Sequence, residues 1–537
     1  MEHPPIPPPR SGLHRLRRPL TIAGLVLLIP FWPASAEAQT DRTASPSEVE
    51  EAVELLKAEG FERSQVMEWA GELTDVFGPR LTGAPETLAA AHWVLDRLGE
   101  WGVREPRLEW WGPFGRGWSN RRMVAHVLEP MPFPVIAHPH PWTPGTAGPM
   151  EADVVLSPFL PEAEEPGRQG PRTSGVQGKV VLMAPEPHLP LLFEPQAERL
   201  SRDELERIAR EPPSDPPPSV SVERPEEAPG AADEPTVRER LQHYGHEGAL
   251  AVLTASSRPP GGGTVHLDVS GASLQGPEEH SVPVLSLAAE HYGRIYRLVR
   301  RGLRVRMELD VENVWSDEPA NGFNILGEVG GDRRPQEVVT LGAHFDSWHL
   351  GTGATDNAAG VAVVMEAMRI LSRTDVALDR TVRLALWTGE EQGLVGSRVH
   401  VLRHYGTVDE PAPAHGTFSL YLNVDNGAGA IRGISLQGNR QAQPIFQEWL
   451  QWVDSDSISV RHTSLRHAGG TDHLSFQEAG LPGFQFIQDP LEYGARTHHT
   501  SMDVYERLPA EDLQHNAVVL AVLAFLAANH VDLLPRD

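Results

Sequence analysis

From about residue 320 onward, short apolar segments typical of strands alternate with longer segments typical of helices. The expected strands cover residues 337–346, 381–388, 418–425 and 483–489, and the expected helices cover 358–371, 444–453 and 510–530. This alternation predicts an α/β fold in which helices cover both faces of a sheet. Ligands of such sheets collect at the carboxyl ends of the strands, so the residues that follow each strand deserve the closest reading.

Acidic and imidazole side chains follow all four expected strands. Taken singly, each has a structural explanation, because a histidine can pack, a glutamate pair can begin a helix and an aspartate can cap a turn. Their recurrence at one edge of the sheet indicates a metal site instead. The chain has no cysteine, so a metal would be held by His, Asp and Glu. In chain order the residues are His344, Asp346, Asp356, Glu390, Glu391, Asp425, His498 and His499.

Two imidazoles and three carboxylates suit a pair of zinc ions. A two-metal site of this kind activates a water molecule and polarises a carbonyl group. The reaction also needs a base that does not bind metal. Adjacent glutamates such as Glu390 and Glu391 can divide these roles, one side chain turning to the metal and the other to the water.

These residues lie in motifs that resemble the co-catalytic zinc peptidase family, which includes bacterial leucyl aminopeptidase, glutamate carboxypeptidase and carboxypeptidase Q. The stretches "HFDSW", "WTGEEQGLVG", "GGTDHLSFQEAG" and "HHTSMD" look most like carboxypeptidase Q, and "FGPRLTGAPE" resembles the family's N-terminal loop. The resemblance spans roughly residues 320–537. It implies a mixed, mostly parallel sheet with helices on both faces and two zinc ions per chain.

The resemblance also implies a role for each matching residue. His344 and Asp425 would hold one zinc, Glu391 and His499 the other, and Asp356 would bridge both. His499 is preferred to His498 because "HTSMD" fits the family's His-x-x-x-Asp ending.

Two further carboxylates would act without binding metal. Glu390 would be the general base, and Asp346 would accept a hydrogen bond from the second ring nitrogen of His344. The family often has a cis peptide after its bridging aspartate, which here would be Asp356–Asn357.

The motifs say less about which residues contact the substrate. Several relatives place a tyrosine before the last histidine, where it faces the developing oxyanion, and His498 or Tyr493 could replace it or simply pack. Asp472 and His473 could line the substrate pocket or brace their own loop. A carboxypeptidase would also anchor the substrate carboxylate with arginine, for which the candidates are Arg466 and Arg496.

The first 38 residues are predicted to be a secretory signal peptide. Four arginines between residues 10 and 18 precede an apolar stretch at 20–31, and small residues allow cleavage after Ala36 or Ala38. An uncleaved anchor is the alternative, but the apolar stretch is short and two prolines interrupt it. No other segment reads as apolar enough to span a membrane. We therefore expect a periplasmic or extracellular protein.

The mature chain is expected to have three parts. Residues 39–130 would form the N-terminal part of a peptidase domain, 131–310 a β-rich insert resembling a protease-associated domain, and 311–537 the zinc peptidase catalytic domain. The proline-rich acidic segment 211–235 is expected to be a surface loop.

The expected function is hydrolysis of dipeptides or short peptides by an exported di-zinc exopeptidase. The alternatives are an aminopeptidase acting on longer peptides, a hydrolase for another bond, and an inactive binding protein on the same fold. The net charge of -27 and the lack of a basic run exclude nucleic acid as a partner. Relatives dimerise, so a homodimer is expected. Terminus preference, side-chain specificity and the native metal are not readable from the sequence.

Overall fold

The computed structural model describes residues 45–160, 175–213, 235–256, 263–276, 278, 280–454 and 459–536. Residues 43–537 form one compact unit. The expected signal peptide and positions 214–234 of the expected acidic loop lie outside the described residues.

A mixed sheet forms the centre of the C-terminal region. Its four central strands run parallel in the order β10, β9, β11 and β14, and antiparallel strands flank them on both sides. This arrangement confirms the predicted fold. The strands are β8 (Arg306–Gly330), β9 (Arg334–His344), β10 (Arg380–Trp387), β11 (Phe418–Asn423), β12 (Ile431–Ser435), β13 (His462–Ser464) and β14 (Gly483–Gln488).

Helices cover both faces of this sheet because alternate strand residues are apolar on both sides. On one face, α7 and α11 pack on the strands, with α1, α2 and α3 adding to the same core. On the other face, α8 and α10 enclose a smaller aromatic core in which the rings of Tyr421 and Phe476 stack at 4.3 Å. The helices are α1 (Pro46–Glu62), α2 (Val66–Gly71), α3 (Pro85–Glu100), α7 (Ala359–Arg373), α8 (Val395–His404), α9 (Gln443–Trp449), α10 (His473–Glu478) and α11 (Ala510–Asn529).

The helix α11 corrects one expectation. By length and hydropathy it could cross a membrane, whereas no segment beyond the N-terminus was expected to qualify. However, 83% of its apolar window is buried inside the protein, where it packs on α7 and α1. Its composition is explained by burial in the core.

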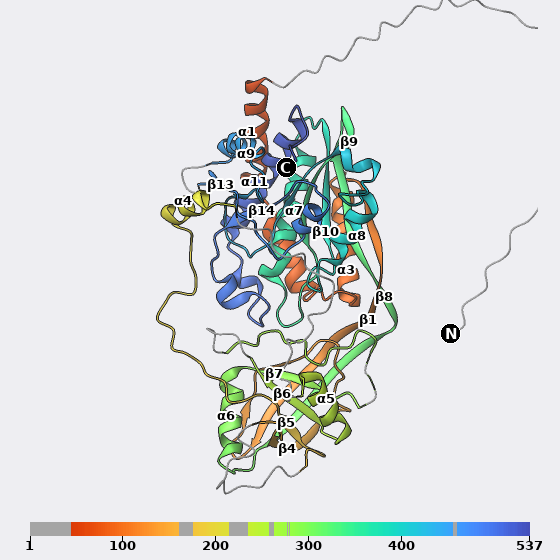
Figure 1. Ribbon diagram of the computed structural model, residues 1–537, viewed down its shortest axis with the longest axis vertical. Coiled ribbons are helices and arrows are strands. Elements are labelled where there is room, and N and C mark those ends of the chain that lie inside the picture. The colour runs from red at the N-terminus through yellow and green to blue at the C-terminus, as the bar shows by residue number, and fades with distance from the viewer. Residues whose placement is uncertain are drawn as a thin grey trace, which may run out of the picture. The chain divides into compact units, whose positions relative to one another are not determined.

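A long two-stranded ribbon joins this sheet to the insert. The strands β1 (Arg104–Glu129) and β8 pair antiparallel from Arg104 opposite Glu328 to Glu129 opposite Arg306. Figure 1 shows the two strands running side by side from the C-terminal sheet into the insert. The strand β1 ends one residue before the expected boundary at 130, while β8 passes through the boundary expected at 310.

The strands of the insert continue the sheet beyond β8. The strand β4 pairs antiparallel with β8, the strands β4, β5, β6 and β7 run parallel, and β3 pairs antiparallel with β7. Helices accompany these strands, so this region is α/β rather than only β-rich. Its elements are β2 (Phe133–Pro134), β3 (Ala137–Pro139), β4 (Met150–Leu156), β5 (Val180–Leu182), α5 (Val237–His246), β6 (Ala251–Ala255), β7 (Val284–Leu287) and α6 (Ala289–Arg300). The helix α4 (Arg202–Arg210) packs instead on β13 of the C-terminal region.

Candidate metal centre

The parallel strands deliver the expected ionisable residues to one edge of the sheet. His344 is the last residue of β9, and Asp425 lies two residues beyond the end of β11. The adjacent glutamates follow β10, and the two adjacent histidines follow β14 after a single helical turn at Tyr493–Thr497. The structure therefore brings together all the side chains that the sequence assigned to metal.

One group of donors surrounds His344. Its Nε2 atom lies 3.2 Å from Asp356 Oδ1 and 3.6 Å from Asp425 Oδ1. All three side chains are buried. The other ring nitrogen, Nδ1, lies 3.0 Å from the main-chain oxygen of Asp346. A carbonyl oxygen only accepts, so Nδ1 carries a proton and Nε2 is directed at the carboxylates.

Asp346 therefore acts differently from the expectation. The hydrogen bond from His344 goes to its main-chain carbonyl, while its carboxylate stays 3.9 Å from Nδ1. That carboxylate instead accepts from the Thr82 hydroxyl at 2.7 Å and from the Glu390 main-chain N–H at 3.3 Å. Asp346 thus connects the histidine to the loop that carries the two glutamates.

A second group of donors surrounds His499. Its Nε2 atom lies 2.9 Å from Glu391 Oε2 and 3.3 Å from Asp356 Oδ2. His498 is farther away, with Nε2 at 3.9 Å from the same Asp356 oxygen, and its ring stacks on His499 at 3.8 Å. Asp356 therefore directs one oxygen to each group.

Hydrogen bonds on both sides of Asp356 hold its loop against other parts of the fold. The Asp503 carboxylate accepts from the Thr355 N–H at 2.6 Å, from the Thr355 hydroxyl at 2.7 Å and from the Asp356 N–H at 3.2 Å. On the other side, the Asn357 side chain donates to the Val424 carbonyl at 2.9 Å. The peptide between Asp356 and Asn357 is cis, which confirms the prediction.

The N-terminal loop supplies two positioning residues that sequence reasoning did not single out. Arg80 is fully buried and donates to five main-chain carbonyls, among them those of Phe345, Thr352 and Gly353. Thr82 donates to Asp346 and accepts from the Gly389 N–H at 3.1 Å. The signal was present in "FGPRLTGAPE", where both residues lie.

Trp348 is a third such residue, and it lies in the quoted motif "HFDSW". Its indole N–H donates to Glu391 Oε2 at 2.6 Å. Its ring packs edge-on against Trp142 of the insert, with the centroids 5.9 Å apart. The insert thus supports the side chain that orients Glu391.

The insert also contacts the backbone around His499. The Leu267 N–H donates to the His499 carbonyl at 2.9 Å, and His266 forms an antiparallel bridge with Thr500. These bonds hold His499 at a positive φ of 58°. Such a conformation is uncommon for a residue with a side chain, so the surrounding contacts have to hold it.

The carboxylates give the site a strongly negative field. Burial and the neighbouring Asp356 raise the pKa of Glu391 to about 7. Burial alone would lower the pKa of His499, but Glu391 and Asp356 outweigh it and raise that pKa to about 10. Such a site attracts cations. Glu391 Oε1 is also buried without a hydrogen bond, so a ligand atom is free. Donor atoms of His344, Asp356 and Asp425 lie within 4.8 Å of one another, and so do donor atoms of Asp356, His498 and His499. Two such groups that share Asp356 fit a pair of divalent ions.

Besides the arginines, four residues are predicted to contact substrate, and their surroundings differ. Tyr493 packs against the ring of His498, with the centroids 4.9 Å apart, and burial raises its pKa well above the usual value. Burial raises the pKa of Asp472 to about 7. His473 is buried, with Nε2 3.0 Å from the Ala468 carbonyl, as expected of a residue that braces its loop.

The two candidate arginines lie near other acidic residues. Arg496 lies 3.9 Å from Glu492, one turn before it. Arg466 lies 3.4 Å from Glu211, which follows α4. Among the described residues, neither arginine forms an ion pair with a member of the two donor groups.

Residues 324–524 match the model of a protein family described as Peptidase family M28. Carboxypeptidase Q of Mus musculus is 23% identical over 501 residues, which cover 93% of each chain. Carboxypeptidase Q of Xenopus laevis is 28% identical over 289 residues, which cover 54% of this chain and 58% of the relative. The chain spans about half the length of several curated relatives that it matches, such as carboxypeptidase Q of Homo sapiens at 52%.

Solved structures give the same fold. A peptidase M28 precursor from Shewanella amazonensis has a TM-score of 0.63 at 20% identity, covering 92% of this chain and 100% of that chain. A zinc aminopeptidase from Bacillus subtilis has a TM-score of 0.50 at 17% identity, covering 85% and 93%. At these identities the likeness establishes the fold alone.

Proposed function

We propose that this chain, whose residues 324–524 match the model of Peptidase family M28, is an exported di-zinc exopeptidase that hydrolyses dipeptides or short peptides. The family match agrees with the resemblance inferred from the motifs. One observation carries the proposal. Asp356 turns one carboxylate oxygen toward His344 and the other toward His499, which also pairs with Glu391, and this is the arrangement required of a bridging ligand.

In this proposal His344 and Asp425 hold one zinc, Glu391 and His499 hold the other, and Asp356 bridges them. The bound zinc pair would supply an activated water and polarise the scissile carbonyl. The chain's own contribution is to fix the donors. The Asp346 carbonyl sets the tautomer of His344, and Trp348 orients Glu391.

Glu390 is the proposed general base. Its carboxylate interacts electrostatically with His344, Asp425 and Glu391, whereas the ion pair with His499 is made by Glu391. Burial raises the pKa of Glu390 well above its usual value; His344 opposes this, while Asp472 and Asp425 add to it. A carboxylate with a high proton affinity is suited to take a proton from water and pass it to the leaving amine. The main-chain N–H of Glu390 donates to Asp346, and this bond fixes the backbone that carries the Glu390 side chain.

Tyr493 and His498 are the proposed contacts of the developing oxyanion. The His498 ring stacks on His499, and the Tyr493 ring packs against His498. Burial, together with the charges of Asp356 and Asp425, raises the pKa of Tyr493. Asp472 and Arg496 are proposed to lie farther along the substrate pocket. The resemblance to carboxypeptidase Q supports dipeptides with both termini free and a homodimer. We also propose that the insert acts as a protease-associated-like cover and that residues 1–38 direct export.

The test is metal content combined with activity. The mature protein is analysed for zinc and assayed on dipeptides and aminoacyl-anilides before and after chelation. Zinc at the shared site together with chelator-sensitive dipeptide cleavage would support the proposal, and cleavage of anilides alone would identify an aminopeptidase instead. A protein that holds zinc and cleaves neither substrate would be a binding protein on this fold, and the proposed activity would be wrong.

A further inference from the structure

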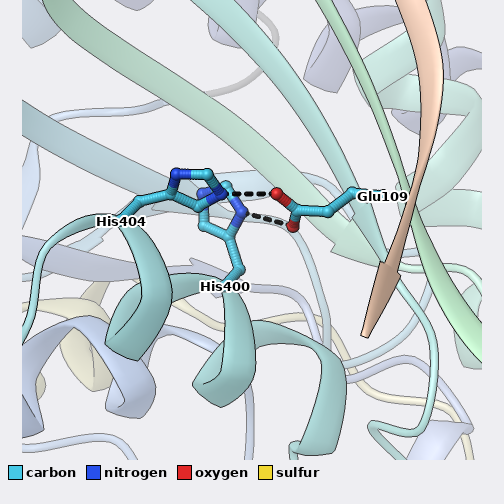
Figure 2. A group of neighbouring side chains, drawn as sticks. All are labelled: Glu109, His400 and His404. Atoms are coloured by element: carbon cyan, nitrogen blue, oxygen red, sulfur yellow. Dashed lines mark hydrogen bonds and ion pairs between the residues drawn. The ribbon is translucent and has the colours of Figure 1, made fainter. Parts of the chain in front are cut away.

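A separate cluster of side chains that could bind a metal lies between β1 and α8, on the face of the sheet that α8 and α10 cover. Figure 2 shows the side chains of His400 and His404 projecting from α8 toward Glu109, which projects from β1. His400 Nδ1 lies 2.7 Å from Glu109 Oε2, and His404 Nε2 lies 2.5 Å from Glu109 Oε1. One donor atom from each of the three residues lies within 4.8 Å of the other two.

The spacing of the histidines suits a shared ligand. His400 and His404 are four residues apart, so they lie on the same side of the helix one turn from each other. Histidine pairs at this spacing bind zinc in helices, with a third residue from elsewhere in the fold completing the set. Glu109 is 291 residues before His400 in the chain, so it is supplied by a different element.

The burial of the cluster also favours a bound ion. The side chain of His400 is 1% exposed and that of Glu109 is 10% exposed. Water therefore shields the charge of the Glu109 carboxylate only in part.

The Glu109 carboxylate has no arginine or lysine in an ion pair among the described residues. Arg383 interacts with Glu109 only through longer-range electrostatics, because its guanidinium donates to Glu328 and to the Tyr405 hydroxyl. Asn324 donates to Glu109 Oε2 at 3.3 Å and to the Gly396 carbonyl at 3.0 Å, so it orients the carboxylate without neutralising it. A buried carboxylate that lacks a permanent cation is a favourable place for a divalent ion.

The cluster is accessible from one side. His404 is 40% exposed, while Glu109 is 10% exposed. An ion could therefore enter past His404 and keep a water molecule as its fourth ligand on that side. None of the three residues belongs to either donor group of the catalytic centre.

We propose that Glu109, His400 and His404 form a third metal site, which binds one zinc-type divalent ion in a His₂Glu set and fastens β1 to α8. The helix α8 directly follows the loop that contains Glu390 and Glu391, and β1 is one strand of the ribbon that leads to the insert. The ion would therefore join two elements that meet only in the folded chain. The site stands independently of the proposed peptidase activity.

The experiment counts zinc by equilibrium dialysis of the full-length protein against Zn²⁺ alone, followed by elemental analysis. His404→Gln and Glu109→Gln should each bind one ion fewer per chain than the wild type. His92→Gln is the matched control, because His92 is exposed on α3 and outside the cluster, and it should bind as many ions as the wild type. Because His404 is half-buried at the end of its helix, His404→Gln is expected to fold even if Glu109→Gln does not.

A second variant separates this site from the catalytic one. His344→Ala combined with His499→Ala should retain the ion that His404→Gln loses, and adding His404→Gln to that double variant should remove it. Equal ion counts in the wild type and His404→Gln would overturn the proposal and leave the cluster as a hydrogen-bonded brace. A peptidase without activity but with the His404-dependent ion would overturn the proposed function and leave this site intact.

Discussion

The indole of Trp348 connects the insert to a proposed metal ligand: its N–H donates to Glu391 Oε2 at 2.6 Å while its ring packs against Trp142. Trp348→Phe should keep the packing and remove the hydrogen bond. Loss of a hydrogen bond to a metal ligand typically weakens metal affinity roughly 10–100-fold, and we expect a loss of that order here. Competition with a chelator would measure it.

The matched control is Trp142→Phe. The Trp142 indole nitrogen is buried without a hydrogen bond, so this substitution changes the same aromatic pair and removes no bond to Glu391. Metal affinity should be close to that of the wild type. Equal losses in the two variants would show that ring packing, not the hydrogen bond, orients Glu391.

Glu390→Gln should separate chemistry from metal binding. The proposed base is not a ligand, so the variant should keep its zinc while kcat falls by roughly 10²–10⁴-fold, the usual contribution of general acid–base catalysis. Parallel measurements of zinc content and dipeptide turnover test this. His344→Ala is the comparison, and it should lose metal together with activity. Full turnover by Glu390→Gln would rule out the assigned role.

Thr82→Val should show how much the N-terminal loop contributes. The substitution removes the hydroxyl that donates to Asp346 Oδ2 and accepts from the Gly389 N–H. The Asp346 carboxylate would keep only its bond from the Glu390 N–H, so we expect kcat/KM to fall by roughly 10-fold, the lower range for loss of an outer-shell partner. Thr87→Val is the control. It removes a hydroxyl bond to the Leu81 carbonyl in the same loop and leaves Asp346 untouched. A larger effect from Thr87→Val would contradict the argument.

Stability should fall in mild acid because of buried histidines such as His515 of α11. Burial lowers its pKa to about 4, whereas the unfolded chain binds a proton near pH 6.5. The unfolded state therefore binds more protons between these values, and the stabilising effect present above pH 6.5 is lost as the pH falls toward 4. One such group contributes a slope of about 1.4 kcal/mol per pH unit.

Urea unfolding of the wild type and His515→Gln at a series of pH values tests this prediction. The unfolding free energy of the variant should depend less steeply on pH. The difference in slope should be at most the contribution of one titrating proton. His92→Gln, at an exposed position, should keep the wild-type dependence. Parallel curves for the wild type and His515→Gln would show that His515 does not titrate with the shifted pKa.

The sequence allowed the C-terminal sheet and the donor residues to be predicted because both depend on local pattern. Strand and helix periods are visible over ten or fifteen residues, and the parallel order of the strands then places their ends together. Even the cis peptide after Asp356 was predictable from a motif. The assignment of each metal ligand remains a prediction that the geometry supports.

The strand β1 was missed because its local pattern is weak. It contains Gly112, Pro113 and Gly115, many of its residues are partly exposed, and its register with β8 shifts repeatedly. Its partner β8 begins only at Arg306, so no short stretch of sequence reveals the pairing. The Trp348–Glu391 bond and the Glu109–His400–His404 cluster were missed for the same reason: they exist only once distant elements pack together.

The bridge between His266 and Thr500 is one of several long-range contacts at this site that bear on the order of folding. Thr82 reaches Asp346 across 264 positions of the chain, and Val265 reaches Ser501 across 236. Contacts of such long range form late and slow a folding reaction. The proposed metal centre would therefore form when folding is nearly finished and would not act as a folding nucleus. An extract containing newly made chains should hold a metal-free, protease-sensitive population that disappears as zinc is taken up.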